Sequence, residues 1–348
     1  MSDTRTIASA LVASLPFPAV LVERADRVVL ANGPALALFP GLRAGLPLAL
    51  SLRAPDVLDA MARARSHASG HHVLWHERVP LERVFDVHVA PISGLSGEPL
   101  LVLAFRDLTA ERRVERMRVD FVANASHELR TPLASLIGFI ETLQGAARAD
   151  PAARERFLGL MHEQAQRMAR LIDDLLSLSH IEQTLHLQPS DRVDLGDVVA
   201  YIADTLSSMA AERGVEMKLS LADSVLVQGD RDELARIAEN LIENAIKYGG
   251  TVGEVFIDVA QRGKQALLRV RDSGPGIAPE HLPRLTERFY RVDVGESRSK
   301  GGTGLGLAIV KHIVARHRGR LDIDSAPGKG ASFTVLLPLF TTDESGGR

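Results

Sequence analysis

The chain of 348 residues contains no cysteine. This absence excludes disulfide bonds, thiolate zinc sites and cysteine nucleophiles, and it fits a reducing compartment. A long apolar run is also missing, because Pro16 and Pro18 interrupt the stretch 8–22, whereas a membrane-spanning helix needs about 20 apolar residues. The first residues lack the basic start and the cleavage site of a signal peptide. We therefore expect a cytoplasmic protein without a membrane span, which reaches a membrane, if at all, through partners.

An excess of charge of either sign is missing too, since 41 Lys and Arg residues stand against 44 Asp and Glu residues. The formal net charge of −3 favours neither nucleic acid nor anionic lipid as a partner. With 45% hydrophobic and 24% charged residues, the composition is typical of soluble globular proteins. Because one hydrophobic core rarely serves so long a chain, we expect two or three domains.

Residues 1–110 combine short strands with short helices. Alternating or continuous apolar runs predict strands at 17–23, 28–31, 72–79, 84–90 and 100–105. An Ala- and Arg-rich segment predicts a helix at 55–68, and residues 94–99 suit a hairpin turn. This part of the chain is expected to be an α/β domain.

Residues 111–188 carry the pattern of two long helices. The first runs from near Asp107 to Leu143, and 145–151 suits the loop that follows it. In the second helix, the residues at alternating steps of four and three are Phe157, Met161, Gln164, Met168, Leu171, Leu175 and Leu178. This is a heptad seam with one polar member. Since a two-helix hairpin offers few partners for a full apolar stripe, we expect two copies to pair as a four-helix bundle.

Residues 189–340 alternate between helix and strand, and 341–348 form a polar tail. Helices are predicted at 230–248, where an Asp opens the helix, and at 303–317. Strands are predicted at 252–261, 264–272, 321–324 and 332–337. The alternation favours a second α/β domain.

The sequence FVANASHELRTPL at 121–133 places His127 beside Glu128, one turn before Pro132. Proline removes a backbone donor and bends a helix, which should lift His127 out of the packed stripe. A neutral imidazole is a nucleophile, and a neighbouring carboxylate can accept the proton that it releases. An isolated His-Glu pair would be better explained as a solvated pair on a helix surface.

Four glycine- or amide-containing segments follow in the C-terminal part. Within ENLIENAIKY at 239–248, Asn240 and Asn244 lie four residues apart on one helix face, and amide oxygens suit Mg²⁺. Segment 272–277, DSGPGI, follows a strand, and its glycines allow close approach of a flat ligand. Segment 301–307, GGTGLGL, opens the predicted helix, where free N–H groups bind phosphate. Segment 327–330, PGKG, completes the set. Each has an ordinary explanation alone, as surface amides or as turns.

Together with ERFYR at 287–291, these segments resemble, in order and spacing, the motifs of bacterial sensor histidine kinases over residues 108–340, about two thirds of the chain. The phosphoacceptor motif and ERFYR are most similar to the phosphate-regulon group. The resemblance implies a dimerisation and phosphotransfer hairpin at 111–188 and a Bergerat-type α/β sandwich that binds ATP at 189–340. Many members of that group carry membrane helices before the sensor domain, and none is visible in this sequence.

The resemblance also implies roles for individual residues. His127 would accept the phosphoryl group, Glu128 would act as general base, and Thr131 would orient a hydrolytic water when the partner is dephosphorylated. Asn244 would hold Mg²⁺, with Asn240 as a second candidate. Residues implied in nucleotide binding are Lys247, Tyr248, Asp272, Gly274, Gly276, Arg288, Arg291, Gly302, Thr303, Gly304, Leu305 and Gly306, with Asp272 contacting adenine. Segment 278–300 would be the lid over ATP.

The implied function is ATP-dependent phosphorylation of His127, followed by transfer to an aspartate of a response regulator. A nucleotide-binding scaffold without turnover would carry the same motifs. Other ATPases of the superfamily, such as chaperones or mismatch-repair proteins, would not explain the segment 121–133. Residues 1–110 resemble a PAS domain, through the expected hairpin at 17–32 and the exit at 107–109. There, His71, His72, His76 and His88 suit ordinary strand and loop positions better than a metal or haem site.

Overall fold

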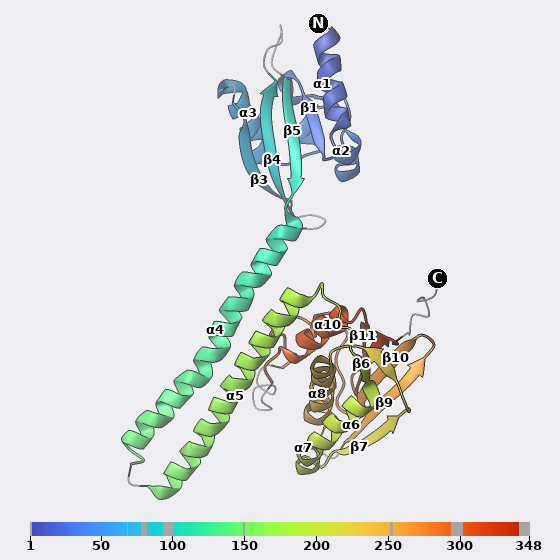
Figure 1. The fold of residues 1–348 in the computed structure, drawn as a ribbon. Helices are drawn as coiled ribbons and strands as arrows, with labels where there is room; N and C mark the ends of the chain where they lie inside the picture. The colour runs from blue at the N-terminus through green and yellow to red at the C-terminus, as the bar shows by residue number, and fades with distance from the viewer. Residues whose placement is uncertain are drawn as a thin grey trace. The chain divides into compact units, whose positions relative to one another are not determined.

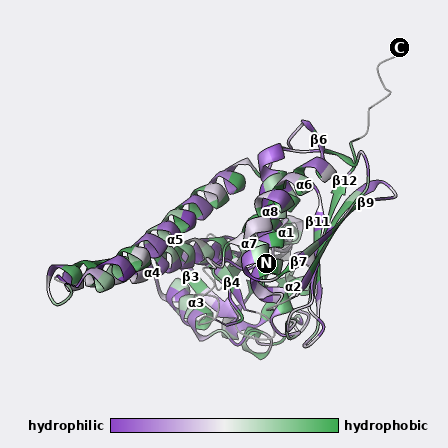
Figure 2. Cartoon of the chain, turned by 90° about the horizontal axis from the view of Figure 1, so that it is seen from below, coloured by the Kyte–Doolittle hydropathy of each residue, from purple (hydrophilic) through white to green (hydrophobic). Residues whose placement is uncertain are grey.

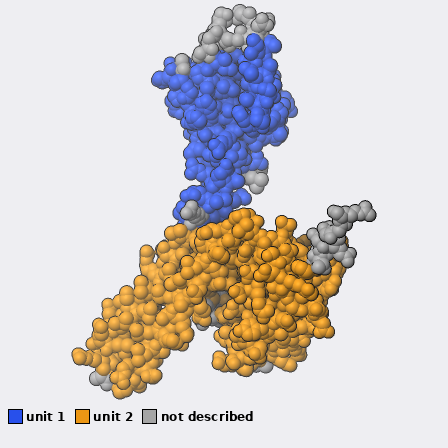
Figure 3. All heavy atoms as spheres, viewed as in Figure 1, with its two compact units in different colours: residues 1–120 blue, residues 121–348 orange. Residues whose placement is uncertain are grey.

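The computed structural model describes residues 2–67, 69–77, 82–92, 100–148, 150–250, 253–293 and 302–340. The chain divides into two compact units, 1–120 and 121–348 (Figures 1 and 3). Within the described ranges, no helix is both long enough and apolar enough to cross a membrane.

The first unit is built on a five-stranded antiparallel sheet with the strand order β2-β1-β5-β4-β3 (Figure 1). Its elements are α1 (Ser2–Ser14), β1 (Ala19–Val22), β2 (Val28–Ala31), α2 (Gly33–Leu38), α3 (Pro55–His67), β3 (His71–Glu77), β4 (Arg83–Ile92) and β5 (Leu100–Asp107), with short 3-10 turns at Arg24–Asp26 and Leu48–Leu50. All five predicted strands and the helix at 55–68 are present, with ends moved by a few residues. The predicted turn at 94–99 lies outside the described residues.

Helix α1 was not predicted from the sequence. It buries Ala8 and Val12 in a small cluster with Ala19, Leu21 and Leu100 of the sheet. The larger core contains Phe39, Trp75, Phe85 and Phe105, whose ring centroids lie 5.2–6.1 Å apart. Clusters therefore form on both faces of the sheet, as its alternating side chains require.

The four histidines that were weighed as a metal or haem site lie on two neighbouring strands. Strand β3 carries His71, His72 and His76, and β4 carries His88. His72 stacks on His88 with ring centroids 4.4 Å apart, and its Nδ1 lies 3.2 Å from Asp86 Oδ1. Among the residues that the structure describes, no three His, Asp or Glu side chains gather as metal ligands.

The second unit begins within α4 (Thr109–Gln144), which forms a helical hairpin with α5 (Pro151–Thr184). Asp150 caps α5, because its carboxylate accepts hydrogen bonds from the N–H groups of Ala152 and Ala153. All seven members of the predicted seam are buried or half-buried. A further set of apolar side chains stays exposed on the hairpin, consisting of Leu133, Ile137, Ile140, Leu158, Ile172 and Leu176, and Figure 2 shows hydrophobic and hydrophilic residues interspersed along it.

The remaining elements form an α/β sandwich (Figure 1). They are β6 (Arg192–Asp194), α6 (Leu195–Thr205), α7 (Ser207–Glu212), β7 (Glu216–Leu221), β8 (Leu226–Gln228), α8 (Arg231–Tyr248), β9 (Glu254–Arg262), β10 (Gln265–Asp272), a 3-10 turn at Leu282–Arg284, α10 (Gly306–Arg316), β11 (Arg320–Ser325) and β12 (Ala331–Pro338). The main sheet has the order β11-β12-β10-β9-β7, in which only the β7–β9 pair is parallel. Strands β6 and β8 pair separately.

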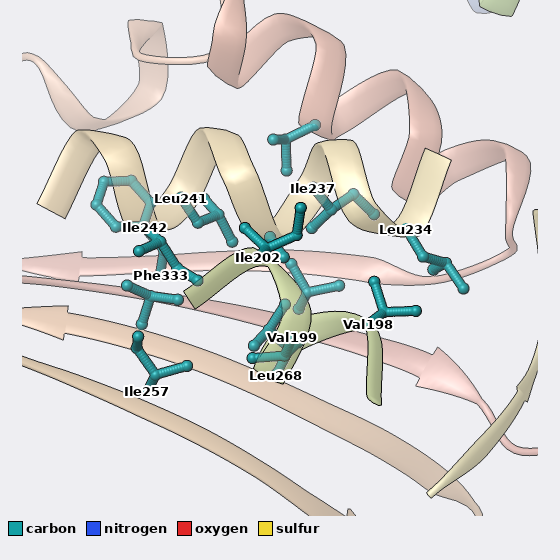
Figure 4. Packing of buried hydrophobic residues seen from close by; sticks show 14 of the residues in the cluster. Val198, Val199, Ile202, Leu234, Ile237, Leu241, Ile242, Ile257, Leu268 and Phe333 are labelled. Carbon is teal, nitrogen blue, oxygen red and sulfur yellow. The ribbon is translucent and has the colours of Figure 1, made fainter. Parts of the chain in front are cut away.

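Burial alternates along β9 and β12, so one face of the main sheet is covered. Helices α6, α8 and α10 supply the cover. Figure 4 shows Leu241 and Ile242 of α8 above Ile257, Leu268 and Phe333 of the sheet. The predicted helix at 230–248 is confirmed, since Asp230 accepts hydrogen bonds from Asp232 and Glu233 N–H at its start.

One predicted helix boundary was wrong. Helix α10 begins at Gly306 and not at Thr303. The reason lies in Gly304, whose φ of +75° is incompatible with a right-handed helix. Residues 303–305 therefore form a loop before the helix.

The side chain of Asn32 forms hydrogen bonds to several backbone segments of the N-terminal unit, and the residue is only 3% exposed. Its amide nitrogen lies 2.8–3.2 Å from the carbonyl oxygens of Val12, Leu15 and Phe17, and its oxygen accepts from Ala19 and Ala35 N–H, each at 3.0 Å. We predict that Asn32→Ala lowers the free energy of unfolding of this unit by about 2–4 kcal/mol, since buried backbone groups lose their partners.

Trp75 is the single tryptophan of the chain and is buried in this unit, so its fluorescence during urea unfolding reports on the unit selectively. Ser14→Ala, which removes an exposed hydroxyl bonded to Leu11, is the control. Equal midpoints for the two variants would contradict the role given to Asn32.

Candidate functional site

His127 lies on α4 with its side chain exposed, as predicted. The helix continues through Pro132, which is buried. One turn after His127, the hydroxyl of Thr131 donates to the His127 carbonyl at 3.3 Å. The imidazole is therefore open to a reactant, while the residues after it belong to an intact helix.

Glu128 is much less exposed, at 17% of its side chain. One of its carboxylate oxygens accepts hydrogen bonds from two guanidinium groups. Arg291 lies 3.0 Å away and Arg167, on the facing helix α5, lies 3.4 Å away. The carboxylate beside the exposed histidine is thus already paired with a residue from the segment 287–291.

Helix α8 carries the two predicted asparagines. The amide nitrogen of Asn240 donates to the Arg236 carbonyl at 2.8 Å. Its oxygen faces Gly306, where any Cβ atom would collide with it. Asn244 follows one turn later and is half-buried. Lys247 pairs with Glu243 at 2.7 Å, as residues four apart on a helix can.

Asp272 ends β10 and is only 7% exposed. Its Oδ1 accepts hydrogen bonds from the N–H groups of Gly274, at 2.9 Å, and Ala331, at 3.2 Å. Burial raises the pKa of this carboxyl above its usual value, although the two backbone N–H groups partly oppose the rise. The carboxylate is therefore held in a fixed orientation in poorly solvated surroundings.

Glycines make the surroundings of Asp272 compact. A Cβ atom at Gly274 would collide with the Tyr248 carbonyl, and one at Gly330 with the carbonyl of Asp272. Gly276 and Gly330 also have φ values of +72° and +71°, which favour glycine. The end of α8 and the turn after β10 consequently lie in close contact.

The loop before α10 contacts segment 287–291. The Phe289 N–H donates to the Gly304 carbonyl at 2.8 Å, and a Cβ atom at Gly304 would press on the Phe289 backbone. The Thr303 hydroxyl accepts from Leu305 N–H at 3.3 Å and donates to Asp174 at 2.8 Å. Leu305 is fully buried and Gly302 half-buried. Residues 294–301, which include the last part of the predicted lid at 278–300, lie outside the described residues.

The structure brings some predicted residues together and directs others elsewhere. Asn240 of α8 contacts Gly306, and at the end of the same helix Tyr248 and Asp272 both lie close to Gly274. Arg288 instead pairs with Glu182 of α5, and its guanidinium lies 5.0 Å from the centre of the Phe121 ring. Arg291 turns to Glu128.

Sequence analysis missed the α5 residues of this region, namely Arg167, Asp174 and Glu182. Each contacts a residue that is at least 39 positions away in the chain. No local sequence pattern predicts such pairs, since they depend on how the two helices of the hairpin pack against each other and against the sandwich.

Two family profiles match the chain. One, described as "His Kinase A (phospho-acceptor) domain", matches residues 117–184. The other, described as "Histidine kinase-, DNA gyrase B-, and HSP90-like ATPase", matches residues 229–341. The first covers the hairpin with His127, and the second covers the region around Asp272, which implies ATP as its ligand.

Similar proteins include "Phosphate regulon sensor protein PhoR" of Pseudomonas aeruginosa, 44% identical over 240 residues, which are 69% of this chain and 54% of PhoR. "Sensor histidine kinase RppB" of Synechocystis is 38% identical over 223 residues, 64% of this chain and 49% of RppB. The chain thus spans about half the length of the curated relatives that it matches.

Among solved structures, Acinetobacter baumannii histidine kinase AdeS is 26% identical with a TM-score of 0.50, covering 62% of this chain and 98% of AdeS. Histidine kinase ThkA, solved in complex with response regulator protein TrrA, has a TM-score of 0.51 and covers 94% of this chain and 97% of ThkA. At 19% identity, this second likeness concerns the fold alone. From the two profiles and the curated relatives, we conclude that the chain belongs to the bacterial two-component sensor histidine kinases.

Proposed function

We propose that the protein is an ATP-dependent histidine kinase, which phosphorylates its own His127, transfers the phosphoryl group to an aspartate of a response regulator, and also dephosphorylates that partner. One observation carries the proposal. The exposed His127 adjoins Glu128, which is ion-paired at 3.0 Å with Arg291 of the ATPase-type domain. The phosphoacceptor helix and the nucleotide-binding domain thus meet within one compact unit.

In the proposed reaction, a neutral His127 nitrogen attacks the γ-phosphorus of ATP in line with the bond to the β,γ-bridging oxygen. That bond breaks, ADP leaves, and Glu128 takes the proton from the other ring nitrogen. Holding the two reactants in line supplies most of the acceleration in such transfers. In the present arrangement, one oxygen of this carboxylate accepts from both Arg291 and Arg167.

We assign adenine recognition to Asp272, because its fixed, poorly solvated carboxylate suits the exocyclic amino group. Lys247 and Tyr248 would contact the nucleotide at the end of α8. The loop 302–306 would approach the phosphates, with Arg288 and Arg291 beside it. The close contact between Asn240 and Gly306, where no Cβ atom would fit, supports this placement.

Magnesium fits the proposed site through the amide oxygen of Asn244, with Asn240 as a second donor. An amide oxygen needs no charged cage, and Mg²⁺ takes its remaining ligands from water and phosphate oxygens. When bound, the ion would neutralise charge on the phosphates of ATP.

We propose three domains, a PAS-like sensor domain at 1–110, a dimerisation and phosphotransfer hairpin at 111–188 and a catalytic domain at 189–340. The five-stranded antiparallel sheet of the first unit is compatible with a PAS fold. The exposed apolar residues of α4 and α5 suit pairing of two hairpins as a homodimer. The similarity to PhoR favours a role in phosphate signalling.

A nucleotide-binding scaffold without turnover is the competing function. We predict that His127→Gln abolishes incorporation of label from γ-labelled ATP, because an amide cannot replace the nucleophilic nitrogen, while ATP binding measured by calorimetry persists. His162→Gln, at another exposed histidine of the hairpin, is the control and should label normally. Labelling of the His127→Gln chain would contradict the assignment, and binding without labelling in the unaltered protein would favour the scaffold.

For Thr131, the prediction concerns hydrolysis of the phosphorylated partner. Thr131→Ala should slow dephosphorylation of a phosphorylated response regulator about tenfold or more, because the hydroxyl that positions water is lost. Autophosphorylation should change little, since alanine keeps the helix. Ser135→Ala is a matched control, because Ser135 also bonds back to the carbonyl one turn earlier. Equal losses in both reactions would refute the role of Thr131.

Asp272→Asn should separate binding from stability. The asparagine oxygen can still accept from Gly274 and Ala331, but its NH₂ group opposes the amino group of adenine. We therefore expect at least about tenfold weaker ATP binding by calorimetry. The domain should stay folded, because no ionised group is then buried.

The pH dependence gives a second measure of the same variant. The pKa of Asp272 is higher in the folded than in the unfolded state, so its stabilising effect is fully present below the unfolded value and is lost as pH rises through the folded value. Relative to Asp272→Asn, the unaltered domain should gain stability as pH falls from neutral. Hydrogen exchange of α8 would measure this, and a gain as pH rises would contradict the burial argument.

A further inference from the structure

Three side chains of the proposed nucleotide site contact carboxylates of the helical hairpin. Arg291 pairs with Glu128 of α4 at 3.0 Å. The Thr303 hydroxyl donates to Asp174 of α5 at 2.8 Å. Arg288 pairs with Glu182, also of α5. Each side chain that is proposed to face a phosphate is thus bound to an anionic group of the same chain.

The carboxylates are held firmly in these positions. Asp174 uses both oxygens, since Oδ2 accepts from Thr303 and Oδ1 accepts from Arg236 of α8 at 3.0 Å. Glu182 also lies 3.5 Å from His312 of α10. The Asp174 and Glu182 side chains are 19% and 33% exposed, so water and salt screen these pairs less than pairs on an open surface.

A carboxylate and a phosphate present similar anionic oxygens to a guanidinium group or a hydroxyl. The donors that now contact the hairpin carboxylates would have to be shared or released when phosphates arrive. Occupation by one anion therefore weakens binding of the other, and by thermodynamic reciprocity a bound nucleotide weakens the contacts to the hairpin.

We propose that Glu128, Asp174 and Glu182 compete with the phosphates of ATP for Arg291, Thr303 and Arg288. The contacts then define a closed state, in which nucleotide affinity is reduced and Glu128 is withheld from the proton of His127. Binding of the triphosphate would release Glu128 as it takes up Arg291. This inference rests on the proposed kinase function and adds a regulatory contact to it.

Two further observations favour a second conformation of segment 287–291. The Nε group of Arg291 is buried and finds no hydrogen-bond partner among the described residues, so the guanidinium is not fully satisfied where it lies. Phe289, two residues earlier, has a φ of +62°, which bulky residues rarely adopt. Its contacts with the Phe121 ring, 5.9 Å between centroids, and with Gly304 hold this backbone in place.

The test uses the full chain with Asp174→Asn and Glu182→Gln combined. Neither residue belongs to the proposed catalytic groups, and the exchange keeps the side-chain shapes. The control combines Glu155→Gln and Glu163→Gln, exposed residues of the same helix, and so changes the net charge equally. Binding of a non-hydrolysable ATP analogue with Mg²⁺, and of adenosine, is measured by calorimetry at constant ionic strength.

We expect the Asp174/Glu182 variant to bind the ATP analogue about fivefold more tightly than the control does, given partly buried ion pairs. Adenosine, which has no phosphate, should bind both equally. Hydrogen exchange of residues 171–182 in the unaltered chain should rise when the analogue is added. Equal affinity of variant and control for the analogue would overturn the inference, and so would equal tightening for adenosine. If the unaltered chain bound no nucleotide, the proposed function itself would fail.

Discussion

The structure of the second unit depends on a hydrophobic seam that α5 shares with the ATPase-type domain. Leu171, Leu178 and Ile181 of α5 are buried in the same cluster as the residues of α6, α8 and α10. Because one helix turn takes 3.6 residues, Asp174 and Glu182 fall beside these apolar anchors. The burial of the apolar side chains thus places two carboxylates against Thr303 and Arg288. The ion pairs follow from the seam, and their own contribution to stability is smaller.

The site around Asp272 depends instead on glycines, which have no side chain. Gly274, Gly276 and Gly330 allow backbone segments to approach until no Cβ atom fits between them. This closeness gives Asp272 its two backbone donors and removes it from water, so the carboxylate is both oriented and costly to ionise. Such a group adds little to folding, and its placement is better explained by binding than by stability.

Sequence patterns predicted the strands of both five-stranded sheets except β7, and they predicted the two long helices, because alternation and heptad spacing report directly on buried faces. They did not predict α1, whose two buried residues make a weak stripe, or β6 and β8, which are three residues long, and they also missed α6, α7 and β7. The start of α10 was misplaced, since it depends on the contact between Gly304 and Phe289. Motifs singled out His127, Asn240 and Asp272 as candidates, whereas the partners of Glu128 come from packing over long chain separations.

In the N-terminal unit, Asn32 has a consequence for motion. Its single side chain is bonded to backbone groups at the end of α1, at the start of β1 and in the first turn of α2. Helix α1 therefore cannot swing outward as an independent flap. Any partner that pulls on it must also loosen the first strand of the sheet, so residues 12–35 respond to force as one cooperative block.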